Sequence, residues 1–80
     1  MKKILITGCN GNLANVIIPY FVKNKFYIIG CDIHDIDSTQ TKYSINLGLN
    51  KYIKCNLSEV GDIHSFLNII KNNNIFPDFL

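Results

Sequence analysis

The order of features between residues 2 and 32 constrains the fold most. A short apolar run, a loop with two glycines, an apolar segment with helical spacing and a second apolar run follow one another. The first run, Lys2–Thr7, has the apolar centre that is typical of a parallel strand covered on both faces. The second, Phe26–Cys31, is β-branched and aromatic and closes on Asp32. This order predicts a βαβ unit with parallel strands.

The segment between these strands, from Gly11 to about Asn24, is predicted to be a helix. Its apolar side chains recur at helical spacing and predict one apolar face, made by Leu13, Val16, Ile17, Tyr20 and Phe21. Pro19 conflicts with a regular helix, because an interior proline removes a hydrogen bond and clashes with the previous turn. We therefore expect a kink at this position.

The rest of the chain continues the alternation of strands and helices. Residues 35–49 are polar and weakly periodic, which predicts a loop that can include a short helix. Lys51–Cys55 is predicted as a third strand. A helix is expected from about Glu59 to Asn72, with Ser58 as its N-cap and an apolar face of Ile63, Phe66, Leu67 and Ile70. Residues 77–80, Pro-Asp-Phe-Leu, predict the entry to a fourth strand.

Length and composition exclude several classes of protein. Eighty residues make one domain at most, and 48% apolar residues indicate a globular chain. The net charge is +2 without any arginine or basic stripe, so we expect no nucleic-acid partner. The apolar stretches are too short for a signal peptide or a membrane span, so we expect a cytoplasmic protein without a membrane partner.

The three cysteines, Cys9, Cys31 and Cys55, each follow or end a predicted strand. Their odd number and wide spacing argue against a disulfide framework. The carboxyl ends of parallel strands are neighbours, so a metal or redox cluster is conceivable. Each cysteine also suits a small buried position, and metal sites usually have closely spaced ligands, so no metal is expected. His34 follows Asp32 by two residues and is expected to be exposed, with a place near the adenosine as the alternative, and His64 is expected to be partly exposed on its helix.

The loop after the first strand has the glycine spacing G-x-x-G-x-x-A between Gly8 and Ala14. Gly8 permits a turn that a Cβ would forbid, Gly11 lets the backbone approach a pyrophosphate, and Ala14 lets the helix pack close to the strand. The amides at the start of the helix then point toward phosphate groups. The loop residues predicted to bind a dinucleotide are Gly8, Asn10, Gly11, Asn12 and Leu13.

Asp32 follows Gly11 by 21 residues and stands at the carboxyl end of the second strand. An acid at this place accepts hydrogen bonds from the hydroxyls of the adenosine ribose and repels a 2′-phosphate. The chain has no arginine to bind such a phosphate, so NAD is favoured over NADP. The alternative is that the two glycines only shape a turn and that Asp32 only caps a loop.

With these residues in place, the segment from Ile4 to Ala14 resembles the T-G-x-x-G-x-x-[GA] opening of extended short-chain dehydrogenases/reductases, the NAD-dependent epimerase/dehydratase group. Residues 56–59, Asn-Leu-Ser-Glu, resemble the D-[LV]-[TS]-D motif of this family, with Asn56 in place of the acid that contacts the adenine edge. Residues 77–80 resemble its P-D-x-[VI] motif. The resemblance implies an α/β fold with an incomplete three-layer Rossmann-type parallel sheet. It also implies that NAD binds with its adenosine near Asp32, Ile33, Asn56 and Leu57.

The same resemblance marks what is missing. Family members use a Y-x-x-x-K pair, and none of the four tyrosines is followed by lysine at that spacing. We therefore expect residues 1–80 to be the N-terminal part of an NAD(P)-binding domain that binds NAD without turnover. A longer parent chain would act on a sugar nucleotide or similar polar metabolite, by family analogy. A non-catalytic dinucleotide-binding module and a truncated product without function remain open alternatives. In the family's strand order the first strand lies between the second and fourth, so self-association through its open edge is expected.

Overall fold

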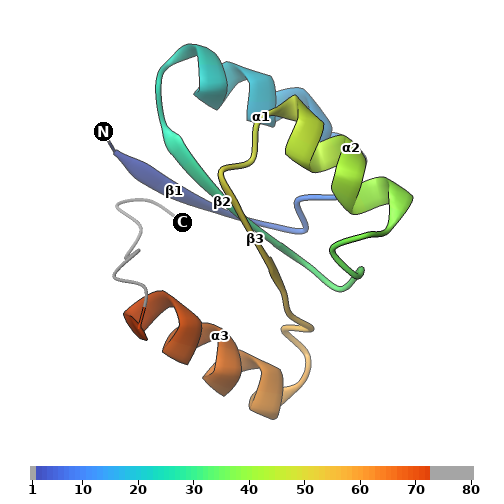
Figure 1. The fold of residues 1–80 in the computed structure, drawn as a ribbon, viewed down its shortest axis with the longest axis vertical. Coiled ribbons are helices and arrows are strands. Elements are labelled where there is room, and N and C mark those ends of the chain that lie inside the picture. The colour runs from blue at the N-terminus through green and yellow to red at the C-terminus, as the bar shows by residue number, and fades with distance from the viewer. Residues whose placement is uncertain (1, 73–80) are drawn as a thin grey trace.

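The computed structural model describes residues 2–72 of the chain. Three strands and three helices alternate along this part of the sequence (Figure 1). The strands are β1 (Lys3–Thr7), β2 (Tyr27–Asp32) and β3 (Lys51–Lys54), and the helices are α1 (Asn12–Lys23), α2 (Thr39–Leu47) and α3 (Val60–Asn72). The predicted fourth strand lies outside the described residues.

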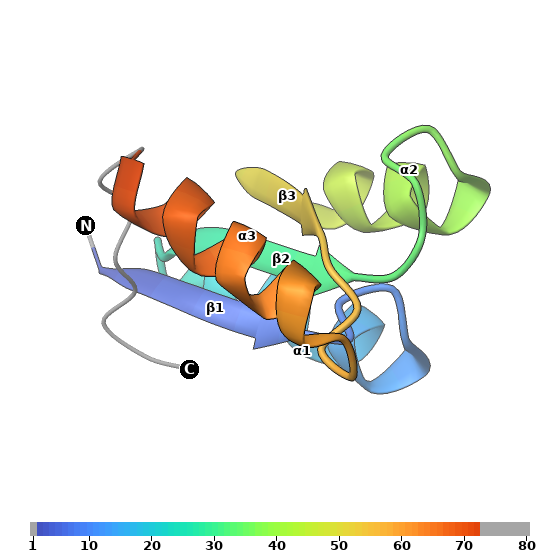
Figure 2. The same ribbon diagram turned by 90° about the horizontal axis from the view of Figure 1, so that it is seen from below.

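The three strands form one parallel sheet in the order β1-β2-β3. In the register, Lys3 is opposite Tyr27, and Ile29 is opposite Lys51. Helices α1 and α2 cover one face of the sheet and α3 covers the other, so the fold has three layers (Figures 1 and 2). The predicted parallel α/β architecture is confirmed.

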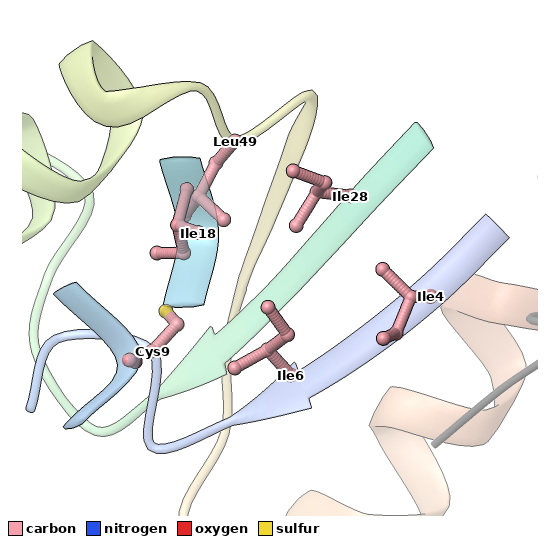
Figure 3. Close-up of a cluster of buried hydrophobic side chains, with 7 residues drawn as sticks. Ile4, Ile6, Cys9, Ile18, Ile28 and Leu49 are labelled. Carbon is pink, nitrogen blue, oxygen red and sulfur yellow. The ribbon is translucent and has the colours of Figure 1, made fainter. Parts of the chain in front are cut away.

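The face toward α1 and α2 holds one of the two apolar clusters. Ile4 and Ile6 of β1 and Ile28 of β2 project from this face and pack against Ile18 of α1 (Figure 3). The cluster also includes Cys9, Ala14 and Leu49. Gly30 of β2 leaves room for this packing, because a Cβ on it would lie 2.7 Å from Leu49 Cδ1 and 2.8 Å from Cys9 Sγ.

The opposite face packs against α3. Its buried side chains alternate with those of the first cluster along each strand, as the two-residue period of a strand requires. They comprise Leu5, Ile29, Cys31, Ile53 and Cys55, and α3 contributes Phe66 and Ile70. β1 and β2 are therefore apolar on both faces, which is why they could be recognised as short continuous apolar runs.

The predicted apolar faces of the two long helices needed correction. In α1 the buried residues are Ala14 and Ile18. Of the predicted face, Ile17 and Phe21 pack partly buried against the core, whereas Leu13, Val16 and Tyr20 are exposed. This helix is apolar on most of its circumference, so periodicity alone did not identify the face that packs on the sheet. In α3, Phe66 and Ile70 are buried as predicted, but Leu67 is exposed.

Two local predictions also differ from the structure. The segment predicted mainly as loop contains the nine-residue helix α2, which Ser38 caps by accepting a hydrogen bond from the Thr41 amide. Helix α3 begins at Val60, and the Glu59 carbonyl accepts its first bond from Ile63, so Ser58 is not the N-cap. The Ser58 hydroxyl instead donates to Asn56 Oδ1.

The placement of the helices determines where a further strand would lie. Right-handed crossovers on one face carry the chain from β1 to β2 and then to β3. Helix α3 lies on the opposite face, so a parallel strand that follows it would lie beyond β1. Within residues 2–72, no strand pairs with that edge of β1. Self-association through this edge stays a prediction.

Candidate nucleotide-binding site

The loop between β1 and α1 turns sharply at Gly8, whose φ of +64° lies in the left-handed region that favours glycine. The Gly11 amide closes the turn by donating to the Gly8 carbonyl at 3.0 Å. Gly11 is the N-cap of α1 and has no side chain to cap the helix, and the first turn carries no acid. The backbone amides of the first turn of α1 thus have no side-chain cap, as in helix N-termini that bind phosphate.

Asp32 ties this loop to the end of β2. Its Oδ2 accepts a hydrogen bond of 2.9 Å from the Asn10 amide, and its Oδ1 accepts one of 2.7 Å from the Ile33 amide. The Cys9 amide also donates to the Cys31 carbonyl and extends the β1–β2 ladder into the loop. A carboxylate offers about four lone-pair positions, so Asp32 retains acceptor capacity for further donors. The side chain is 15% exposed.

The side chain of Asn10 faces α2 and takes part in a polar network that the sequence did not reveal. Its Nδ2 donates to Thr41 Oγ1 at 3.0 Å, and its Oδ1 accepts from the Ser44 hydroxyl at 2.8 Å. Thr41 and Ser44 are fully buried. The S-x-x-T spacing from Ser38 to Thr41 was the available signal for the start of α2. The Asn10 side chain thus fixes α2 to the glycine loop, while its backbone amide holds Asp32.

The ends of β2 and β3 bring the remaining predicted residues to the same edge of the sheet. Ile33 and Leu57 follow these strands, and their apolar side chains are exposed, by 56% and 45%. Asn56 is held in place because its amide donates to Asp62 Oδ2 and its Oδ1 accepts from the Ser58 amide and hydroxyl. The Asn56 side-chain NH2 group then remains to donate.

Two hollows border this edge. One of about 390 Å³ lies against the glycine loop and is lined by Asn10, Asn12, Asn15, Thr39, Gln40 and Tyr43. A larger hollow of about 610 Å³ follows β3 on the outer side of the sheet and includes no residue of the glycine loop. The smaller hollow is the one that the loop helps to form, and it contains no Lys or Arg side chain.

The three cysteines are buried, as predicted for small core residues. Burial, reinforced by the nearby Asp32 carboxylate, raises the pKa of Cys9 to about 12. Burial, followed by the neighbouring Cys55, raises the pKa of Cys31 to about 12. These thiols are held in their protonated form at neutral pH. Among residues 2–72, no group of three or more His, Cys, Asp or Glu side chains is arranged for a metal ion.

No protein-family model matches the chain, and no curated protein matches it. Among solved structures, it is similar to 4-hydroxyisoleucine dehydrogenase complexed with NADH, with 26% identity and a TM-score of 0.77 over 98% of this chain. It is also similar to a mutant of that enzyme complexed with NADH and succinate, with 26% identity and a TM-score of 0.75 over 96% of this chain. In both cases the chain spans 31% of the length of the other protein.

The chain has a partial Rossmann-type fold. In Rossmann-type sheets, ligands bind outside the carboxyl ends of the strands, where the direction of winding reverses. Here that place is the carboxyl end of β1, because α1 and α3 leave the sheet on opposite faces. The structure brings all nine predicted site residues to this edge. Their contact with a dinucleotide stays a prediction. No helix within residues 2–72 is long and apolar enough to cross a membrane.

Proposed function

We propose that this chain binds NAD(H) and forms the nucleotide-binding part of an oxidoreductase of the extended short-chain dehydrogenase/reductase type. The observation that carries this proposal is the direct bond from the Asn10 amide to Asp32 Oδ2. It joins the two halves of a dinucleotide site, the loop for the pyrophosphate and the acid for the ribose. The likeness to two NADH-bound dehydrogenase structures supports it.

Each part of the site has a distinct task in this proposal. The amides of Asn12 and Leu13, at the uncapped start of α1, bind the pyrophosphate. Asp32 accepts hydrogen bonds from the ribose hydroxyls with its remaining lone pairs. The adenine ring lies against the exposed side chains of Ile33 and Leu57, and Asn56 donates to the edge of the ring.

Charge favours NAD over NADP. The Asp32 carboxylate stands where a 2′-phosphate would approach, and the hollow beside the loop has no Lys or Arg to offset it. Two like charges at close range disfavour binding, and a phosphate carries about −1.5 to −2 at pH 7. Bound nicotinamide supplies hydride transfer, and the residues described here position its adenosine half.

Turnover in this proposal needs residues that this chain does not contain. The chain spans 31% of the length of its structural neighbours, and its sequence contains no Y-x-x-x-K pair. We propose that the residues for catalysis come from elsewhere, and that the substrate is a sugar nucleotide or a similar polar metabolite, as the family resemblance implies. Purified alone, the 80-residue chain should bind NAD without turning over substrate, since positioned acid–base groups contribute about 10²–10⁴-fold in rate.

Calorimetric titration of the 80-residue chain with NAD and with NADP tests the proposal. We expect NAD to bind more tightly, and Asp32→Asn to weaken NAD binding by about 1.5–3 kcal/mol because a charged acceptor is lost. Asp35→Asn is the matched control, since Asp35 lies on the same loop but pairs with Lys54 at 2.6 Å. Equal weakening by both substitutions, or equal affinity for both nucleotides, would contradict the assignment of Asp32.

A further inference from the structure

The side chain of His34 lies beside the acid of the proposed ribose site. His34 Nδ1 is 3.8 Å from Asp32 Oδ1 and 3.3 Å from Asn10 Nδ2. The His34 side chain is 37% exposed, so the ring is partly covered while solvent still reaches it. The sequence favours an exposed position for His34, with a place near the adenosine as the alternative; in the structure the ring lies against the glycine loop.

The hydrogen bonds determine which ring nitrogen carries the proton in neutral His34. Asn10 Nδ2 has two hydrogens, and one of them is directed to Thr41 Oγ1. The second is directed to His34 Nδ1, which must then accept. The proton of the neutral ring is therefore on Nε2. If Nδ1 were also protonated, its N–H would face the N–H of Asn10 Nδ2. The ring would then turn so that Nδ1 donates to Asp32.

Apart from Asp32, the neighbouring ionisable groups that could pair with a protonated His34 ring have contacts of their own. Asp35, the next residue, pairs with Lys54 of β3. The hydroxyl of Tyr52, also on β3, lies within hydrogen-bond distance of the carbonyls of His34 and Asp32, and burial raises its pKa. The first turn of α2 carries no acid. Asp32 is thus the carboxylate to which a protonated His34 ring can turn.

We propose that His34 determines how strongly the site discriminates between NAD and NADP, and that its protonation relaxes this discrimination. Histidine changes charge between pH 5 and 8. A protonated ring beside Asp32 offsets the carboxylate charge that repels a 2′-phosphate. NAD carries an uncharged hydroxyl at this position, so its affinity changes less. This inference rests on the proposed function, because it concerns the same ribose site.

The test is a set of calorimetric titrations of the 80-residue chain with NAD and NADP between pH 5.5 and 8.5. The variant His34→Gln is the control. Glutamine can accept from Asn10 but does not titrate, and in both proteins the 2′-phosphate itself gains a proton near pH 6. We expect the affinity ratio of NADP to NAD to rise on acidification by about three- to tenfold more in the native chain than in the variant.

The outcomes separate this inference from the proposed function. If NAD binds but the ratio changes equally in both proteins, the role of His34 is wrong and the NAD site stands. If neither nucleotide binds at any pH, the proposed function fails and the inference fails with it. Nitrogen chemical shifts of the His34 ring add an independent readout. At pH 8.5 they should show the proton on Nε2, and a proton on Nδ1 would overturn the geometry.

Discussion

Substitution of Asn10 by alanine should destabilise the fold by about 2 kcal/mol. The variant loses the bonds of the Asn10 side chain to Thr41 and Ser44, both fully buried, and each such bond contributes about 1 kcal/mol. The bond to His34 is more exposed and adds less. The cost should not rise far above this value, because Thr41 Oγ1 keeps the Ser38 hydroxyl and Ser44 keeps two carbonyl acceptors.

Urea unfolding followed by circular dichroism measures this effect. With a slope of about 1 kcal/mol per molar urea, the midpoint should fall by about 2 M. Asn12→Ala is the control, since Asn12 is exposed at the start of α1 and its replacement should change the free energy of unfolding by less than about 0.5 kcal/mol. If the two variants are equally stable, the network between the loop and α2 does not stabilise the protein as described.

Two further substitutions and one pH titration test the core packing, a left-handed backbone position and the buried thiols. Gly30→Ala should lower the free energy of unfolding by about 1–3 kcal/mol in a urea titration, because its Cβ would overlap with Leu49 and Cys9. Lys25→Gly should raise it by about 0.5–1 kcal/mol in the same titration, because Lys25 has a φ of 62°. The raised pKa values of Cys9 and Cys31 mean that their thiols ionise more readily in the unfolded chain. The melting temperature should therefore be unaffected by these thiols below pH 9 and should fall between pH 9 and 12.

The strands and the acid of the site could be predicted from the sequence because their signals are local. The centres of β1 and β2 are short runs of buried residues, and Asp32 is the last residue of β2. The parallel direction of the strands and the position of Asp32 at the end of the second strand follow from this pattern, whereas the strand order came from the family resemblance. The loop geometry at Gly8 was predictable for the same reason, since a left-handed turn favours glycine.

What could not be predicted depends on partners far away in the chain. Helix α2 has a polar buried side, because Thr41 and Ser44 bond to Asn10, which lies 31 and 34 residues earlier. A polar and weakly periodic segment is typical of a loop unless those partners are known. The position of His34 beside Asp32 and Asn10 likewise depends on how the loop folds back. In α1 the apolar residues surround most of the helix, so the buried face depended on the sheet that it meets.

The most direct test of the NAD site is an NMR titration of the 80-residue chain with NAD, followed through the backbone amides. We expect the largest shifts at Gly11, Asn12 and Leu13 at the start of α1 and at Ile33 after Asp32. We expect small shifts along Lys51–Lys54, which line the larger hollow. Shifts centred on that hollow, or none at millimolar NAD, would contradict the central claim that the glycine loop and Asp32 together bind the nucleotide.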